Sequence, residues 1–397
     1  MGKASDNSLL LRGARIVAPD RVIEPGAALI EGAKIARIFD PDVNNLPAAD
    51  SVRDLRGLTL FPGFIDLHIH GAVGVDAMAA TSGDLSRVAE FLARNGVTSW
   101  LPTLVPSPLE QYERAVKVVQ QLLQEQEMRA GSPSSRVLGV HYEGPFVNSE
   151  QCGALHREHF RTFTDATDLD ALPTIKNETA VNMMTLAPEI GDGVGLVNEL
   201  TRRGWIVSIG HTRATVDVLD RALQAGARHM THFMNAMSPL HHRAPGPVGW
   251  GLIHDDVTCD LIADGVHIDP SILKLILRTK TAERLSLISD AIAAAGLGDG
   301  EYQIWGEKIV VKEGRTENTR GNIAGSVITM LDGVRMMLSL GVSDFEVGRM
   351  AALNPARLLR IDRDYGSIEE GKRADLVALD NDGNARLTII GGRIAFQ

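Results

Sequence analysis

Residues able to bind metal ions recur along this chain, and a histidine pair near residue 70 is the first of them. The apolar run 61–71, FPGFIDLHIHG, ends in His68 and His70. Residues two apart share a face of an extended strand, so both imidazoles point to the same side. Neutral imidazoles are common ligands of zinc and similar ions. The pair alone is weak evidence, and it predicts half of a metal site only if other motifs supply the rest.

Four further candidates each follow a short apolar run farther along the chain. Glu143 lies in GVHYEGPF, His211 in IVSIGHT, His232 in HMTHFMNAM and Asp290 in SLISDAIAAAG. Imidazole and carboxylate ligands together suit Zn²⁺ or a similar divalent ion. A lone histidine at a strand end is more often a polar cap, and Asp290 by itself could begin a helix. Whether these residues meet depends on the elements that carry them.

The elements that must position these residues follow an alternating pattern. Apolar or β-branched runs span residues 62–68, 97–104, 136–142, 181–187, 205–210, 228–232, 257–263 and 285–289. Segments with a helical period, such as DLSRVAEFLARNG and TVDVLDRALQAG, lie between most of them, and several end in glycine. The pattern predicts an α/β fold, a TIM-like (β/α)₈ barrel. The alternative is an open parallel sheet, but the glycine-rich dinucleotide fingerprint is missing after the first strand.

In such a barrel the chemistry lies at the C-terminal ends of the strands. The candidates stand at five such ends, which favours one metal site at the barrel mouth over a set of unrelated polar caps. Glu143 could bridge two ions, one of them held by His211 and His232. The other ion would then be held by His68, His70 and Asp290. The poorly periodic stretch 144–180 is predicted to be an irregular loop after the third strand.

The two ends of the chain have a different pattern from its middle. Residues 8–60 contain short strand-like runs separated by turns, and ADLVALD and ARLTIIGGRIAF repeat this pattern near the C-terminus. Neither block is long enough to bury a core alone. We therefore predict a small β-sandwich domain from residues 1–61 and 364–397, with the barrel over residues 62–363.

Composition excludes several classes of protein. With 397 residues, 44% of them hydrophobic, the chain can bury a large core. Its net charge of −10 argues against binding to nucleic acid or an anionic membrane surface. The N-terminal MGKASDNSLLL lacks the apolar core of a signal peptide, and no run has the length of a membrane span. Two cysteines, Cys152 and Cys259, cannot form a disulfide framework, so we expect a cytoplasmic protein.

A series of short motifs occurs in the same order as in one known family. They are HIHG, HYEGPF, TLAPE, IGHT, THFMNAMSPLHHR, ADGVH, SDAIAAAGLGDGEY, IAGS, NPARLL and GSIEEGKRADLVALD. Over about residues 55–380 the chain resembles the N-acetylglucosamine-6-phosphate deacetylase family of the amidohydrolase superfamily. The resemblance implies a barrel with a β-sandwich built from both termini, a homodimer, and hydrolysis of an N-acetyl group from a phosphorylated amino sugar.

The resemblance also assigns roles at the metal site. Glu143, His211 and His232 match the family's metal ligands. Some members keep only that metal, but this chain retains the HxH pair, so one or two divalent ions are expected, with Zn²⁺ preferred and Fe²⁺ possible. Asp290 matches the catalytic acid/base that takes a proton from water and gives it to the departing amine. Many superfamily relatives bridge two metals with a carboxylated lysine at the fourth strand end, where this chain reads TLAPE.

Substrate contacts are implied in the same way. Arg243, which follows NAMSPLHH, matches a phosphate contact, alongside the backbone at Asn235 and Ala236. A guanidinium fork binds phosphate through two bonds, although a surface salt bridge is the alternative for Arg243. His267, in ADGVH, matches a sugar-contacting histidine, and a buried core histidine is the alternative. The loop that closes on the ligand is matched by Ile323, Ala324 and Gly325.

One departure from the family concerns the loop after HYEGPF. Close relatives often place a histidine third in this loop to orient the acetamide, whereas this chain reads Gly153-Ala154-Leu155-His156. Leu155 cannot donate a hydrogen bond, so His156 must reach in, the metal alone must polarise the carbonyl, or the acyl sugar differs. The galactosamine epimer is therefore an alternative substrate. Another N-acyl or cyclic-amide substrate, or a non-catalytic barrel, are further alternatives.

Overall fold

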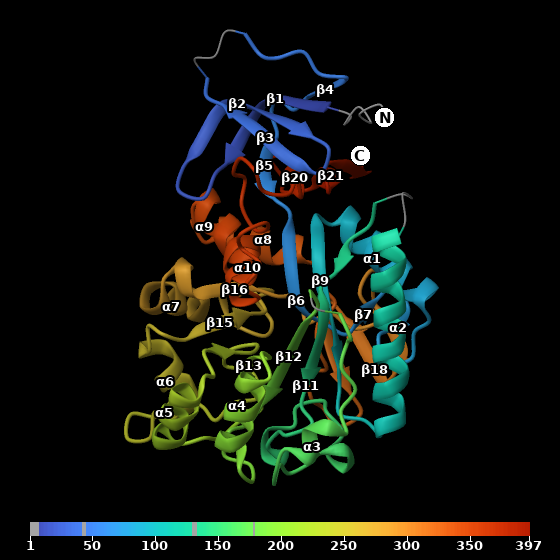
Figure 1. Ribbon diagram of the computed structural model, residues 1–397. Coiled ribbons are helices and arrows are strands. Elements are labelled where there is room, and N and C mark those ends of the chain that lie inside the picture. Colours follow the sequence, from blue (N-terminus) through green and yellow to red (C-terminus); the bar gives the residue numbers. More distant parts are fainter. Residues whose placement is uncertain (1–7, 42–44, 129–132, 178) are drawn as a thin grey trace.

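The computed structural model of this protein describes residues 8–41, 45–128, 133–177 and 179–397. Its centre is a parallel barrel (Figure 1). The barrel strands, in spatial order, are β6 (Phe64–Ile69), β9 (Val97–Leu104), β11 (Gly139–Glu143), β12 (Val181–Leu186), β13 (Ile206–Ile209), β14 (His229–Met230), β15 (Thr258–Leu261) and β16 (Leu285–Leu287). The short β10 (Arg136–Val137) also pairs with β9. The predicted TIM-like barrel is confirmed.

The barrel closes between its last and first strands. Past the end of β16, the Asp290 N–H donates to the His68 carbonyl at 2.9 Å, and the His70 N–H donates to the Ala291 carbonyl at 2.8 Å. Ile69 and Ala291 form a parallel bridge. Every residue of β6, β9 and β11 is buried, as expected for strands with helices outside and a packed interior. This seam therefore carries three ligand candidates, His68, His70 and Asp290.

Helices, most of them amphipathic, follow the strands and cover the barrel. They are α1 (Ser82–Arg94), α2 (Leu109–Met128), α4 (Gly193–Arg202), α5 (Val216–Ala225), α6 (Gly246–Ile253), α7 (Pro270–Lys280) and α8 (Met330–Ser339). Thr81 and Asp84 form a capping box that starts α1, and Gly226, with φ 119°, ends α5. Among the described residues no helix is both long and apolar enough to cross a membrane.

Residues 144–180 form the predicted irregular loop after β11. Its described residues, 144–177 and 179–180, contain no regular element except the single turns η1 (Ser149–Gln151) and η2 (Arg157–His159) and the short α3 (Thr167–Asp170). After β6, the two-residue strands β7 (Gly71–Ala72) and β8 (Val75–Asp76) form a small ribbon.

Strands from both ends of the chain form one eight-stranded sheet at one end of the molecule (Figure 1). They are β1 (Ser8–Val17), β2 (Val22–Glu31), β3 (Lys34–Phe39), β4 (Ser51–Asp54), β5 (Thr59–Pro62), β20 (Leu376–Leu379), β21 (Ala385–Ile390) and β22 (Arg393–Phe396). β20 pairs with β5, and apolar side chains of both terminal blocks share one cluster. The helical segments α9 (Asp344–Gly348), η4 (Arg349–Leu353) and α10 (Asn354–Leu358) precede its C-terminal part. The domain limits at 61/62 and 363/364 stay a prediction.

A three-stranded antiparallel meander, which the sequence analysis did not predict, lies between β16 and α8. Its strands are β17 (Gly300–Ile304), β18 (Glu307–Lys312) and β19 (Arg315–Asn318). The first turn is Trp305-Gly306 and the second Glu313-Gly314, with φ values of 52° and 78°, and 52° and 76°. Two-residue turns with positive φ at both positions match the twist of a hairpin.

Candidate metal centre

Glu143, the last residue of β11, lies at the centre of the candidate ligands. Its Oε1 is 2.9 Å from His211 Nε2 and 3.0 Å from His232 Nε2. The same oxygen is 3.6 Å from His68 Nε2, and Oε2 is 3.4 Å from His70 Nε2. One carboxylate therefore faces both histidine pairs, and its bridging of two ions stays a prediction.

The structure brings the other ligand candidates to the same point. Asp290 Oδ1 is 3.4 Å from His68 Nε2 and 3.2 Å from His70 Nε2. Two groups have donor atoms within 4.8 Å of one another, and both contain Glu143. The groups are His68, His70 and Glu143, and Glu143, His211 and His232. All of these side chains are buried.

Imidazole orientation tests whether these residues fit a cation. His70 Nδ1 is 3.2 Å from the Thr103 carbonyl, and His211 Nδ1 is 2.7 Å from the Gln151 carbonyl. A carbonyl only accepts, so each Nδ1 carries a proton, and Nε2 is the nitrogen of each ring that faces inward and can bind a metal ion. His68 Nε2 lies 3.2 Å from His70 Nε2, and His232 Nε2 lies 3.1 Å from His211 Nε2. Lone pairs brought this close fit a divalent ion between them.

The electrostatics of the cluster also favour positive charge. Burial raises the pKa of Glu143, but the charge of His68 and contacts with His211 and His232 outweigh it and hold the pKa well below its usual range. Burial lowers the pKa of His70, but Asp290 and the charge of Glu143 outweigh it and raise the pKa to about 9. Nε2 of His70, which faces both carboxylates, is therefore a point where either a proton or a metal ion supplies positive charge. Burial likewise raises the pKa of Asp290, and His68 and His70 reverse the shift. Both carboxylates are therefore anionic at neutral pH.

Three ligand candidates occupy backbone conformations that side chains rarely adopt. His211, His232 and Asp290 have φ values of 48°, 31° and 50°. Such conformations carry strain and persist where surrounding contacts fix them. For Asp290 those contacts include its N–H bond to His68 and the bond from the Ser326 N–H to its carbonyl, 2.7 Å. Strain concentrated at these strand ends marks a functional site.

Asp66 is a buried residue of the centre that the sequence analysis missed. It accepts from the Ser289 hydroxyl at 2.6 Å and from the N–H groups of Ser289 and His68. Burial raises its pKa to about 6. Asp66 thus links β6 to the segment after β16, just below two ligand candidates. The available signal was its position two residues before His68, on the same strand face.

His141, to which the sequence analysis assigned no role, is fully buried beside the cluster. Its ring centroid is 4.7 Å from that of His68. His141 Nδ1 lies 3.0 Å from the Leu67 carbonyl, and Nε2 lies 2.8 Å from Thr185 Oγ1. Burial and the charge of His68 hold its pKa well below the usual range. A neutral His141 therefore donates to Leu67, accepts from Thr185 and supports the His68 ring.

Among the candidate substrate contacts, Arg243 is exposed in a loop between β14 and α6. Its guanidinium contacts His242 Nε2 at 3.1 Å, and no carboxylate of the described residues pairs with it. The Asn235 side chain donates to the His232 carbonyl at 3.2 Å, and Ala236 has a φ of 50°. His267 Nδ1 lies 2.6 Å from Asp264 Oδ2. These residues follow β14 and β15, so they border the mouth on one side.

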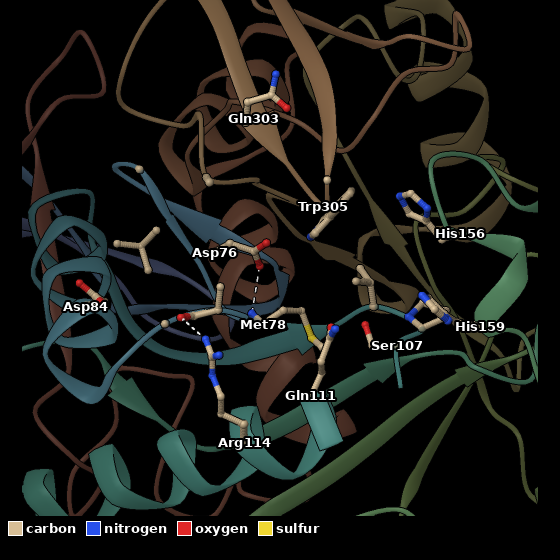
Figure 2. Close-up of a pocket in the computed structure, with 18 of the residues that line it drawn as sticks. Asp76, Met78, Asp84, Ser107, Gln111, Arg114, His156, His159, Gln303 and Trp305 are labelled. Atoms are coloured by element: carbon tan, nitrogen blue, oxygen red, sulfur yellow. Dashed lines mark hydrogen bonds between the residues drawn. The ribbon is translucent and has the colours of Figure 1, made fainter. Parts of the chain in front are cut away.

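The remaining candidates lie around the opposite loops. Ala154 and Leu155 are buried, with Leu155 in the main hydrophobic core, while His156 contacts Glu158 Oε1 at 3.2 Å. His156 is turned toward a separate cavity (Figure 2) rather than into the ligand cluster. The segment Ile323, Ala324 and Gly325 runs beside the seam. A side chain at Gly325 would come within 2.9 Å of the Asp290 carbonyl.

A closed parallel barrel with imidazoles and carboxylates buried at its C-terminal strand ends defines a metal-dependent hydrolase. Residues 59–395 match the amidohydrolase family. The N-acetylglucosamine-6-phosphate deacetylase of Bacillus subtilis is 35% identical, over 98% of this chain and 97% of that protein. The N-acetylgalactosamine-6-phosphate deacetylase of Escherichia coli O157:H7 is 36% identical, over 97% and 99%.

Solved structures agree with these relatives. The N-acetylglucosamine-6-phosphate deacetylase from Pasteurella multocida has a TM-score of 0.89 and 32% identity, covering 98% of this chain and 100% of its own. The chain belongs to the amidohydrolase family, and within it to the N-acetylglucosamine-6-phosphate deacetylase group.

The shared position of Glu143 predicts how metal content responds to mutation. We expect Glu143→Gln to remove most bound metal, because it takes an anionic ligand from both groups at once. The double change His68→Ala and His70→Ala should remove at most one ion. Elemental analysis of purified protein gives the metal-to-protein ratio, with His241→Ala as the control. A ratio unchanged by Glu143→Gln would exclude it as a ligand.

Proposed function

We propose that this protein hydrolyses the acetyl group of N-acetylglucosamine 6-phosphate, giving glucosamine 6-phosphate and acetate. The observation that carries the proposal is Glu143, shared by two imidazole pairs with Asp290 beside them, in a chain similar throughout to such deacetylases. A galactosamine epimer is the second candidate, because the relative named for it is equally similar.

The metal ligands and the reaction fit together in this proposal. Glu143, His211 and His232 would hold one divalent ion, and His68 and His70 would hold a second with the same carboxylate. Such an ion, when bound, polarises the amide carbonyl and acidifies water. Imidazole and carboxylate donors favour Zn²⁺, with Fe²⁺ as the alternative. The strand end TLAPE contains no lysine, which leaves bridging to Glu143.

Asp290 is assigned the proton transfer. Its depressed pKa makes it a carboxylate at neutral pH, and Oδ1 lies beside the HxH pair at the closure of the barrel. It would take a proton from the attacking water and deliver it to the nitrogen as the carbon–nitrogen bond breaks. The products are then acetate and a free amine.

We assign binding of the phosphate and of the sugar ring to Arg243 and the residues around it. The Arg243 guanidinium has no carboxylate partner among the described residues, so its charge is available for a phosphate. The backbone at Asn235 and Ala236 and the His267–Asp264 pair would complete that side. The acyl side would be bounded by the loop containing Ala154 and Leu155 and by the segment 323–325.

Two wider properties belong to the same proposal. The family resemblance implies a homodimer, and the exposed apolar side chains of Leu240, Ile253 and Leu275 are available to an interface. Sedimentation analysis should then give twice the 42.8 kDa chain mass. Cys152 and Cys259 are both free and buried, in keeping with a cytoplasmic location. Fractionation of the source cells would test that location.

Acetate release tests the function directly. The purified protein supplied with Zn²⁺ should release acetate from N-acetylglucosamine 6-phosphate faster than from its galactosamine epimer or from the unphosphorylated sugar. Faster release from the epimer would transfer the assignment to the second candidate. No release from any of them would overturn the deacetylase proposal.

The role of Asp290 predicts a loss of turnover without a loss of fold. Asp290→Asn keeps the shape but cannot accept a proton, so kcat should fall about 10²–10⁴-fold. Metal content and thermal stability, measured on the same preparation, should change little. A kcat near that of the parent protein would remove Asp290 as the proton carrier.

The role of Arg243 predicts an effect that depends on the phosphate. Arg243→Ala should mainly raise KM for the phosphorylated sugar, because it removes binding present in both ground and transition states. Hydrolysis of the unphosphorylated sugar serves as the internal control and should be unaffected. If KM stays the same, the arginine does not bind the phosphate.

A further inference from the structure

A cavity of about 820 Å³ lies next to the metal centre but outside it. It is bordered by the loops after β6, β9 and β11, by the N-terminal parts of α1 and α2 and by the tip of the β17–β18 hairpin (Figure 2). Its lining includes Asp76, Ser107, Gln111, His156, His159 and Trp305. None of the ligand candidates lines it. The proposed reaction, as far as it has been described, makes no use of this space.

Trp305 is the contact between the cavity and the metal centre. Its ring stands edge-on to His70, with centroids 5.1 Å apart and an interplanar angle of 85°. The same side chain lines the cavity, where the indole faces Asp76 (Figure 2). The indole therefore stands as a wall, with a ligand candidate on one side and open space on the other.

The backbone at Trp305 makes a large aromatic residue unexpected. Trp305 is the first residue of a two-residue turn with positive φ at both positions, 52° there and 78° at Gly306. Such turns favour asparagine, aspartate or glycine, because side chains crowd the backbone at positive φ. Keeping a tryptophan where the turn disfavours it is consistent with a role for the indole itself.

Barrel geometry places this wall on the acyl side of the substrate. The phosphate and sugar candidates Arg243 and His267 follow β14 and β15, whereas the cavity loops bearing Ser107 and His156 follow β9 and β11. In the closed eight-stranded order these strand pairs are four strands apart, so they stand opposite each other. In a hexosamine 6-phosphate the C2 nitrogen and C6 lie across the ring, so the acyl chain points away from the phosphate.

We propose that Trp305 determines which acyl chains this enzyme accepts, by separating the metal centre from the adjacent cavity. The inference rests on the proposed function and deepens it. With the indole in place, the acyl side ends at the ring and fits an acetyl group. Without it, the cavity continues from the reacting carbonyl and accommodates longer N-acyl groups on the same sugar phosphate.

Trp305→Gly tests the proposal, because glycine removes the indole and suits the positive φ. The measurement is kcat/KM for N-acetyl- and N-butanoylglucosamine 6-phosphate. We expect the butanoyl-to-acetyl ratio to rise about tenfold or more, since each methylene that a pocket rejects alters discrimination by at least that factor. Trp305→Asn, which also suits the turn, should shift the ratio in the same direction.

Glu313→Gly is the matched control. Glu313 occupies the same position in the second turn of the meander, with φ 52° followed by Gly314 at 76°, and it is exposed away from the cavity. Its ratio should equal that of the parent protein. Metal content is measured on each variant, because loosening of His70 would lower both activities together and leave the ratio unchanged.

The outcomes separate this inference from the function beneath it. If the parent protein releases acetate and the butanoyl-to-acetyl ratio of kcat/KM is raised in both Trp305 variants, the proposed role of Trp305 is supported. If the parent protein releases acetate but this ratio is unchanged in both variants, the proposed role of Trp305 is wrong while the deacetylase function stands. If the parent protein releases no acetate from the phosphorylated sugars, the proposed function fails, and the inference that rests on it fails as well.

Discussion

The active end of this protein depends on one buried carboxylate that faces two pairs of imidazoles. Glu143 lies within 3.0 Å of His211 and His232 through one oxygen and within 3.4 Å of His70 through the other, so the two pairs share its negative charge. Taking these groups out of water is costly unless positive charge joins them. The barrel makes the arrangement possible, because parallel strands deliver residues far apart in sequence to one mouth. The strained backbone at His211, His232 and Asp290 is part of the same arrangement, because it places these side chains at the mouth beside Glu143.

Much of the fold could be predicted from the sequence because its signals are periodic. The apolar runs at 62–68 and 97–104, for example, lie within two residues of β6 and β9. The position of the candidate ligands at strand ends followed from the barrel, and the structure brings them together. Their roles stay predictions, as do the domain limits. His141 and Asp66 were missed because a buried polar residue inside a barrel has no periodic signature that separates it from the core.

The loops show where sequence reasoning fails. His156 stands one place from the position at which the family has a histidine, and only the fold reveals that it pairs with Glu158 beside a cavity. The meander containing Trp305 was missed for a different reason. Its strands are short, and turns with positive φ at non-glycine residues contradict local preference. The conformation of these segments depends on tertiary contacts, such as that between Trp305 and His70, which local sequence does not reveal.

The sheet built from both ends of the chain bears on how the protein is made. β20 lies between β21 and β5, so the edge of β5 stays open until the ribosome has passed the entire barrel. The strands that cover this apolar edge are thus translated after the barrel, and a chain terminated before them exposes it. An uncovered edge strand invites pairing with other chains and aggregation. A copy that stops before β20 therefore carries this liability even when its candidate metal-binding residues have all been synthesised.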